Sequence, residues 1–324
     1  GHDYNQIITA LQDAQRSDRP SLIACKTIIG FGAPNKAGTA ACHGAPLGEQ
    51  ELAEARNKLG WESQAFEVPE KIMNIWRSVG RRSQKQFTSW SDRLTRSDPN
   101  TKEAFDLAIT GHLSEELAET VNLFKKGVSK EKPKWATRKA SGEFLESLVN
   151  ILPTLTGGSA DLTGSNNTKT SKSKSIEFND FSGSYIYYGV REFGMAAIMN
   201  GMALHGGVIP YGGTFLVFAD YMRPAIRLSA LMKQRVIYIL THDSIGLGED
   251  GPTHQPVETL ASLRAIPNLN VFRPADPVEV AECWALALAS QFAPSVIALT
   301  RQGVPTLRKK YTENNLCESG GYII

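Results

Sequence analysis

From residue 135 onward, apolar runs short enough to be strands alternate with longer segments whose apolar residues recur at helical spacing. The strand-like runs are residues 154–162, 235–241, 269–274 and 294–301, and the helical segments are 137–152, 191–206, 214–234, 255–266 and 277–290. Strands that are apolar nearly throughout are typical of a parallel sheet buried on both faces. The alternation therefore predicts an α/β fold, a doubly wound parallel sheet with helices on both faces.

Residues 1–134 follow a different pattern. Residues 20–29, PSLIACKTII, form a short apolar run that predicts a buried strand, and the glycine-rich loop 30–48 follows it. Residues 49–61 return to helical spacing, with acidic side chains in a first turn where the helix dipole favours them. Residues 61–134 are charged, with spaced apolar positions, and end in SKEKPK, so they predict a helical linker before a second domain.

Composition narrows the class of protein. The 324 residues carry 35 basic and 33 acidic side chains, a formal charge of +2, so no global field favours nucleic acid or a membrane surface. No apolar run approaches the roughly 20 residues of a membrane helix. Four cysteines without a C-x-x-C pair favour a reducing compartment, and we expect the cytoplasm. The chain opens with GHDYNQI and closes with GGYII, and we expect it to be part of a longer one.

The loop THDSIGLGEDGPTHQP, residues 241–256, carries two histidines, two aspartates and a glutamate just past a predicted strand end. Arg301 with Gln302, and Asp161 with Ser165, follow two other predicted strands. In a doubly wound sheet, ligands bind at the carboxyl ends of the strands. We therefore expect these polar groups to converge on one rim and to bind a small ligand.

Three interpretations of the loop compete. Its acidic and histidine side chains could ligate a metal, but they are spread along a glycine-broken loop without the spacing of a zinc site, so no metal site is predicted. They could merely cap turns, which is the usual role of any one of them taken alone. Alternatively, the glycines and prolines fix the path of the loop without filling it and leave room for a polyhydroxylated ligand.

Two features of the helical segments admit a structural and a functional interpretation. Glu192 lies in a first turn, where the helix dipole alone would stabilise it. The alternative is a carboxylate in an apolar pocket, whose pKa would rise so that it could share a proton with a heterocycle. Phe215, Phe218 and Tyr221 recur at three-residue spacing, as core residues of one helix face do. Stacked on a flat ring, they would form a recognition platform.

Basic residues could form an anion site. Arg138, Lys139 and Arg301, with Ser165, could hold phosphate oxygens, because guanidinium groups bind them in a bidentate fork. The alternative is solvated surface charge. No G-x-x-x-x-G-K-[ST] is present, and GFGAPNKAG fails the spacing of the dinucleotide fingerprint, so neither nucleotide motif is supported.

Seven segments stand out, in this order along the chain: HGAPLG, GGSADLTGSN, YGVREFGMAAIMNG, GGTFLVFADYMRPAIRLSAL, THDSIGLGEDGPTHQPVETLASLRAIPNL, RPAD and SVIALTRQ. They resemble the motifs of the transketolase family, and the resemblance runs along the whole chain. The resemblance implies the thiamine-diphosphate-binding fold. Residues 1–60 would be the end of a pyrophosphate-binding domain, 61–134 a helical linker, 135–310 the pyrimidine-binding domain, and 311–324 the start of a linker to a C-terminal domain outside this chain.

The resemblance implies thiamine diphosphate as cofactor, with Mg²⁺ or Ca²⁺ held by ligands in an N-terminal segment outside this chain. Glu192 would be catalytic, binding the aminopyrimidine ring nitrogen so that the cofactor can form its reactive carbon. Phe218 would stack on the pyrimidine, with Phe215 and Tyr221 lining its pocket. Asp161 would approach the cofactor at a dimer interface.

The resemblance also assigns substrate-binding roles. The residues placed around the sugar phosphate group are Arg138, Ser165, His242 and Arg301. Asp250 would bind the hydroxyl next to the carbonyl. His254 and His43 would handle protons and hydroxyls near the reacting carbons, and His43 would also contact the cofactor. Asp243 and Glu249 receive no chemical role and are candidates for holding the shape of the loop.

The implied reaction moves a two-carbon ketol unit from a ketose phosphate such as xylulose 5-phosphate to ribose 5-phosphate or erythrose 4-phosphate, in the pentose phosphate pathway and the Calvin cycle. The implied enzyme is a cytoplasmic homodimer with its active site between the subunits and no nucleic-acid or membrane partner. We expect this chain alone to be inactive. Two alternatives stay open: a related ketol transferase such as dihydroxyacetone synthase, and a non-catalytic fragment that only dimerises or binds the pyrimidine.

Overall fold

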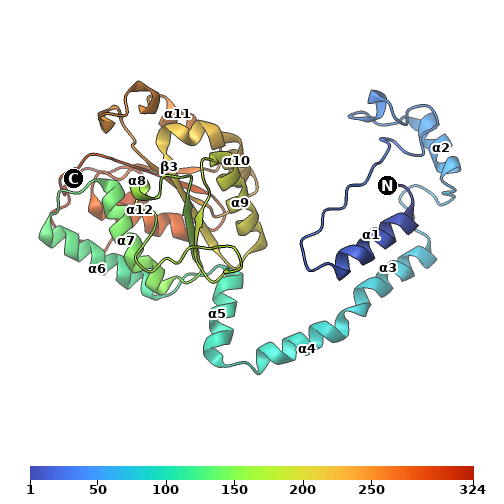
Figure 1. Cartoon of the computed structure of the whole chain (residues 1–324), viewed down its shortest axis with the longest axis horizontal. Helices are drawn as coiled ribbons and strands as arrows, with labels where there is room; N and C mark the ends of the chain where they lie inside the picture. Colours follow the sequence, from blue (N-terminus) through green and yellow to red (C-terminus); the bar gives the residue numbers. More distant parts are fainter. The chain divides into compact units, whose positions relative to one another are not determined.

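The computed structural model describes residues 1–324, which form two compact units, Gly1–Arg93 and Leu94–Ile324. The first unit is built from helices and loops, and the second contains the whole sheet (Figure 1). No helix in either unit is both long and apolar enough to cross a membrane.

Six parallel strands form the sheet of the second unit, in the order β2-β1-β3-β4-β6-β5. They are β1 (Leu155–Ser159), β2 (Tyr185–Tyr187), β3 (Ile209–Phe215), β4 (Ile237–Thr241), β5 (Asn270–Phe272) and β6 (Ser295–Leu299). From β1, the next strand in sequence (β2) is added on one side, whereas β3 and the later strands are added on the other. The strand order therefore reverses between β1 and β3. An open α/β sheet binds its ligands at such a point, past the carboxyl ends of the strands.

Helices cover both faces of this sheet, which confirms the predicted doubly wound fold (Figure 1). One face carries α6 (Glu116–Glu131), α7 (Thr137–Ile151) and α12 (Pro277–Ala289), and the other carries α9 (Glu192–His205), α10 (Ala219–Leu231) and α11 (Thr259–Arg264). Successive strand residues alternate between the two cores: Ile237 and Ile239 of β4 pack on one side, Tyr238 and Leu240 on the other. Burial on both sides explains why the strands are apolar nearly throughout.

The central strand β3 corrects the predicted helix 214–234. The strand continues to Phe215, the short 3-10 helix η2 (Leu216–Phe218) follows, and α10 begins only after it. Pro210 and Gly213 make this strand hard to predict from sequence, because proline and glycine are rare inside strands. Close packing requires the glycine, since a Cβ there would lie 2.6 Å from Thr168 Cγ2. The short strand β2 likewise has no counterpart among the predicted elements.

Residues 20–29 do not form the predicted strand. The segment has no regular structure, and Leu22 is 95% exposed. A strand needs a partner for its N–H and C=O groups, and the unit Gly1–Arg93 contains no strand. The N–H of Ile28 instead donates to a side chain, His2 Nε2, at 2.8 Å.

The remaining helices lie before the sheet. They are α1 (Tyr4–Arg16), η1 (Ala40–Cys42), α2 (Glu49–Lys58), α3 (Glu70–Arg82), α4 (Gln84–Thr95) and α5 (Pro99–Thr110). Helix α2 confirms the predicted helix 49–61, and residues 61–134 are mostly helical. Helix α6 also packs into the core under α7 and α12, through Leu117 and Val121. The domain boundaries stay a prediction.

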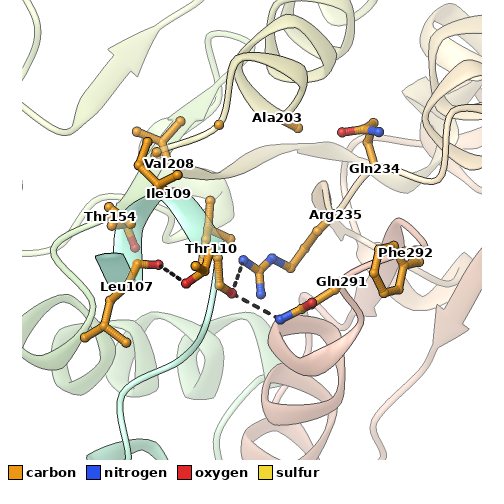
Figure 2. Close-up of a pocket in the computed structure, with 15 residues that line it drawn as sticks. Leu107, Ile109, Thr110, Thr154, Ala203, Val208, Gln234, Arg235, Gln291 and Phe292 are labelled. Carbon is orange, nitrogen blue, oxygen red and sulfur yellow. Dashed lines mark hydrogen bonds between the residues drawn. The ribbon is translucent and has the colours of Figure 1, made fainter. Parts of the chain in front are cut away.

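Arg235, just before β4, connects α5 to the sheet by hydrogen bonds at the amino ends of the strands (Figure 2). Its guanidinium donates to Leu288 O at 2.9 Å, in the last turn of α12, and to Gly111 O at 2.7 Å, just past the end of α5. Gln291 Nε2 donates to the same Gly111 carbonyl at 3.4 Å. Helix C-termini carry negative partial charge, so one cation stabilises two of them. Burial lowers the pKa of Arg235.

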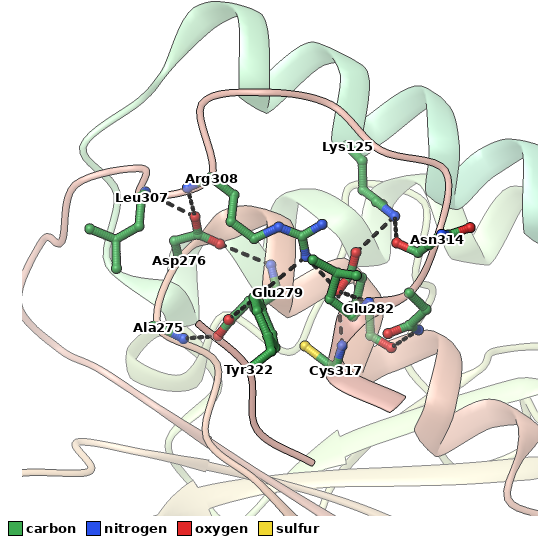
Figure 3. Close-up of polar contacts among 12 residues, drawn as sticks. Lys125, Ala275, Asp276, Glu279, Glu282, Leu307, Arg308, Asn314, Cys317 and Tyr322 are labelled. Atoms are coloured by element: carbon green, nitrogen blue, oxygen red, sulfur yellow. Dashed lines mark hydrogen bonds and ion pairs between the residues drawn. The ribbon is translucent and has the colours of Figure 1, made fainter. Parts of the chain in front are cut away.

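The segment that follows β6 is anchored to α12 through Glu282 (Figure 3). Glu282 is fully buried and pairs with Lys125 Nζ at 2.8 Å and with Arg308 Nη1 at 2.6 Å. Its Oε2 also accepts the N–H groups of Leu316 and Cys317, at 3.0 and 3.2 Å. A buried charge is tolerated when it is paired and hydrogen-bonded in this way. The network therefore ties η5 (Leu316–Ser319) to α6 and α12.

Candidate active site

The carboxyl ends of β3 and β4 bring a row of rings together. Phe215 ends β3 and stacks on His242, the first residue after β4, with ring centroids 3.7 Å apart and planes inclined by 28°. Phe215 also stacks on Phe218 at 5.7 Å, and the ring of His254 lies 5.2 Å from that of Phe218, with the planes inclined by 70°. Tyr221 continues the row 5.8 Å from Phe218 and is 66% exposed. The three aromatic residues thus come from a strand, a 3-10 helix and α10, which corrects the predicted single helix face.

Two arginines reach the same rim, Arg138 from the start of α7 and Arg301 from the end of β6. Arg138 Nη1 donates to the main-chain oxygen of Ser165 at 2.6 Å. Burial and the positive charge of Arg301 lower the pKa of Arg138, so the two guanidinium groups are close enough to repel each other. An anion bound between them would relieve the repulsion, which makes this rim a candidate anion site.

His242 is uncharged at neutral pH. Its side chain is buried, and this burial, reinforced by the charge of Arg138, lowers its pKa to about 4, although Asp250 acts in the opposite direction. The residue adopts a φ of +59°, in the left-handed region that non-glycine residues rarely occupy. A ligand therefore meets a neutral imidazole, which can donate one hydrogen bond and accept one but carries no charge.

Two acidic residues hold the loop after β4 in shape, as expected. Asp243 Oδ2 pairs with Arg273 Nε at 2.8 Å, and Glu249 Oε1 pairs with Arg301 Nη2 at 2.7 Å. The carboxylate of Asp243 is buried, so its pair anchors the base of the loop. The side chain of Glu249 is 76% exposed, and an exposed pair of this kind contributes little energy. Glu249 therefore contacts Arg301 through a weak surface pair that a stronger anion could displace.

Glu192 is the first residue of α9 and only 8% exposed, yet its carboxylate forms no hydrogen bond or ion pair within the chain. Its carboxylate oxygens are not among the fully buried polar atoms that lack a partner, so they are open to a ligand. Asp161 follows β1 with a φ of +61° and is exposed. Both residues lie past the carboxyl end of a strand, β2 for Glu192 and β1 for Asp161, where the sequence places them.

His43 belongs to the other unit, Gly1–Arg93. Its glycine-rich loop folds around Glu51, whose carboxylate accepts the N–H groups of Asn35 and Lys36 at 2.8 and 2.9 Å. Lys36 Nζ in turn donates to Leu47 O at 2.7 Å. His43 is exposed at the end of η1. Its participation in the site of the second unit stays a prediction.

Three buried polar residues that no sequence motif singles out connect to this site: Ser159, Asn166 and Thr241. They form a chain of hydrogen bonds that ends on His242. In the sequence, each appears only as a polar side chain at or beyond the end of a strand. A turn residue would give the same pattern, so the sequence does not mark them as functional. No group of three or more His, Cys, Asp or Glu side chains is placed to hold a metal ion.

Two family models match the chain. Residues 133–306 match the pyrimidine binding domain of transketolase, and residues 1–114 match the thiamine diphosphate binding domain of transketolase. With the doubly wound sheet, these matches define the class as thiamine-diphosphate-binding α/β proteins. The first model alone covers more than half of the chain, and the chain belongs to the transketolase family.

Individual relatives agree with this assignment. The chain is 51% identical over 324 residues to the transketolase of Cereibacter sphaeroides, covering 100% of this chain and 49% of that protein. It is also 51% identical to the transketolase of Sinorhizobium medicae, covering 100% of this chain and 46% of that protein. The chain thus spans about half the length of the curated relatives it matches.

Solved structures show the same fold. A transketolase from Leishmania mexicana superposes with a TM-score of 0.86 at 40% identity, covering 94% of this chain and 45% of that one. A transketolase variant from Pichia stipitis, in complex with fructose 6-phosphate, superposes with a TM-score of 0.89 at 36% identity, covering 99% of this chain and 48% of that one.

Proposed function

We propose that this chain supplies the pyrimidine-binding and substrate-binding part of a transketolase, which transfers a two-carbon ketol unit from xylulose 5-phosphate to ribose 5-phosphate or erythrose 4-phosphate. The observation that carries the proposal is the unpartnered carboxylate of Glu192, a mostly buried residue whose oxygens are open to a ligand, at the sheet edge that also carries the aromatic row and the two arginines. A carboxylate, stacked rings and cations together fit a ring-containing cofactor and a phosphorylated sugar.

The residues present fit the pyrimidine of thiamine diphosphate. Glu192 would hold a proton shared with a ring nitrogen, and the faces of Phe218 and Phe215 would stack on the ring, with Tyr221 at its border and Asp161 nearby. When bound, the cofactor supplies a nucleophilic carbon and an electron sink for carbon–carbon bond cleavage. No group of three or more His, Cys, Asp or Glu side chains is placed to hold a metal ion, and we assign no residue of this chain to Mg²⁺ or Ca²⁺.

The two arginines would bind the phosphate group of the substrate. Arg138 and Arg301 provide fork-shaped donors, Ser165 lies against Arg138, and the neutral imidazole of His242 adds one hydrogen bond. The mutual repulsion of the two guanidinium groups would be relieved only when the anion is bound. This difference favours phosphorylated sugars over their unphosphorylated forms.

The carbonyl end of the sugar would contact Asp250 and His254, in the loop that follows β4. Asp250 would accept a hydrogen bond from the hydroxyl next to the carbonyl. The ring of His254 lies nearly perpendicular to the rings of Phe215 and Phe218, with centroids 6.0 and 5.2 Å away. It would move a proton at the reacting carbons together with His43 from the other unit.

We further propose that the protein is a homodimer that uses α9 and α10. These helices pack on each other and still expose large apolar side chains, a pattern typical of interaction surfaces. The side chains are Phe193, Ile198, Leu204, Leu228 and Leu231.

The four cysteines, Cys25, Cys42, Cys283 and Cys317, are unpaired, which supports a role in the cytoplasm, in the pentose phosphate pathway or the Calvin cycle.

Glu192→Gln in the protein that carries this chain tests the proposal. Glutamine keeps the shape but cannot share a proton as a carboxylate does, so we expect turnover to fall by about 10²- to 10⁴-fold while the KM for sugar phosphates changes little. The measurement is ketol transfer from xylulose 5-phosphate to ribose 5-phosphate. Glu116→Gln, at an exposed first-turn glutamate of α6, is the matched control. Near-normal turnover of the Glu192 variant would exclude its role.

Arg301→Ala tests the phosphate site. Hydrogen bonds to charged groups contribute about 1.5–3 kcal/mol, so the KM for a ketose phosphate should rise about tenfold to hundredfold with a smaller change in kcat. Glu249→Gln is the control, because it removes the partner of Arg301 but keeps the cation. An unchanged KM in the Arg301 variant would remove that residue from the phosphate site.

A further inference from the structure

A buried chain of hydrogen bonds runs from β1 to the imidazole of His242. Ser159 Oγ donates to Asn166 Oδ1 at 2.9 Å, and Asn166 Nδ2 donates to Thr241 Oγ1 at 2.7 Å. Thr241 Oγ1 lies 2.9 Å from His242 Nδ1. Ser159, Asn166 and Thr241 are all fully buried. Their polar atoms must therefore find their partners within the protein.

The direction of these bonds fixes the proton of the imidazole. The oxygen of Thr241 already accepts an N–H of Asn166, and Nδ1 of His242 is its only other partner. The single hydroxyl proton of Thr241 therefore points at Nδ1, which accepts it. A neutral ring whose Nδ1 accepts carries its proton on Nε2. Nε2 forms no hydrogen bond within the chain. It is not one of the fully buried atoms that lack a partner, so it is accessible to a ligand.

We propose that Asn166 is a positioning residue that sets the Nε2–H tautomer of His242, so that the neutral ring presents a hydrogen-bond donor to an anionic group beside Arg138 and Arg301. The second half of this inference rests on the proposed phosphate site. Phosphate oxygens only accept, so the opposite tautomer would turn a lone pair toward them and weaken binding. Protonation cannot supply the donor at neutral pH, because the pKa of His242 is about 4.

The network has one other self-consistent direction. Ser159 could donate to Gly213 O, 3.1 Å away, and a rotated Asn166 amide could then accept from Thr241, which would place the imidazole proton on Nδ1. Gly213 O already accepts the N–H of Ala160 at 3.0 Å, so it needs no second donor. The two directions predict opposite tautomers, which makes the inference open to a direct test.

The test reads the tautomer from the two ring nitrogen shifts of His242, by NMR on the full chain with labelled histidine. His242→Asn assigns the signal by removing it. The wild type should carry its proton on Nε2. Asn166→Asp, recorded at alkaline pH where the new carboxylate only accepts, should make Thr241 donate to it and move the proton to Nδ1. A proton on Nδ1 in the wild type, or one that does not move in the variant, would overturn the inference.

Two substitutions of Thr241 keep the test decisive if the Asn166 variant does not fold. Thr241→Ser keeps the hydroxyl group and should keep the proton on Nε2. Thr241→Val keeps the shape but removes the partner of Nδ1, so both tautomers should appear. Identical tautomer populations in the two variants would also overturn the inference.

Titration with inorganic phosphate separates this inference from the proposed function. Phosphate should shift the Nε2 signal of the wild type, and its affinity should be at least about tenfold weaker in Asn166→Asp. A wild type that carries Nε2–H but does not bind phosphate would reject the proposed phosphate site alone. Equal phosphate affinities, with the proton moved in the variant, would overturn the link between Asn166 and anion binding.

Discussion

At the scale of single residues, the neutral state of His242 couples the site to stability. The pKa of this histidine is about 4 in the folded chain, against an ordinary value of 6.5. Between these values the unfolded chain binds a proton that the folded chain does not, so this residue lowers the free energy of unfolding as the pH falls through that window. Above about pH 7 both states are neutral and the effect is absent.

Urea unfolding at a series of pH values checks this prediction. His242→Asn cannot titrate in this range, so its free energy of unfolding should fall less than that of the wild type between about pH 7 and pH 4. Arg138, Arg301, Asp250 and His254 act on His242 and are all retained in the variant, so the comparison isolates His242. The same pH dependence in both proteins would contradict a buried, neutral imidazole.

Single residues also mark the limit of what sequence predicts. His242 and Arg301 could be placed on one rim, because each follows an apolar strand and parallel strands end at the same edge. Asn166 could not be linked to His242. Its partners, Ser159 and Thr241, lie 7 and 75 residues away along the chain, on different strands. Only the folded sheet, in which β1 and β4 lie on either side of β3, brings them into one network.

At the scale of elements, β1 and β3 pack too closely to admit side chains at some positions. A Cβ on Gly157 would lie 2.0 Å from Cζ of Tyr211, a ring that is 1% exposed. Overpacking a core costs about 1–3 kcal/mol, occasionally more, so Gly157→Ala should lower the free energy of unfolding by at least that amount. Gly127→Ala is the control: it lies in α6 with open space around its Cβ and should stabilise the chain by about 0.5–1 kcal/mol. Equal unfolding midpoints in urea would contradict this packing.

The anchor of the C-terminal segment is a second property of elements. Glu282→Gln removes the charge that Lys125 and Arg308 share, and breaking a buried ion pair in this way costs about 3–5 kcal/mol. The amides of Leu316 and Cys317 lose their charged acceptor and should exchange hydrogen faster, as mass spectrometry can measure. Glu318→Gln, at an exposed position of the same segment, should change neither stability nor exchange. Unchanged exchange in the Glu282 variant would contradict the anchor.

Periodicity predicts most of the elements, and packing explains the exceptions. The strands β4, β5 and β6 are apolar runs bounded by polar residues, so their pattern is clear. Strand β3 contains Pro210 and two glycines, and its role follows only from neighbours that leave no room for side chains. The aromatic residues at its end were therefore predicted on a helix, although their contact with one another follows from the turn after β3.

At the scale of the whole molecule, an apolar run predicts burial but does not name a partner. Residues 20–29 read as a buried strand, yet their own unit, Gly1–Arg93, holds no strand for them to pair with. The family could be predicted from sequence, because its motifs occur in order along the chain, and the family models confirm it. The activity of the whole protein remains the central proposal, since the chain spans about half of its relatives.

The fate of two labelled carbons tests this proposal most directly. Xylulose 5-phosphate labelled at its first two carbons is mixed with unlabelled ribose 5-phosphate, thiamine diphosphate and the protein that carries this chain. We expect both labels to move together onto the first two carbons of a seven-carbon ketose phosphate, with no label in the three-carbon product. Labels that stay in the donor, or that move together with its third carbon, would contradict two-carbon ketol transfer.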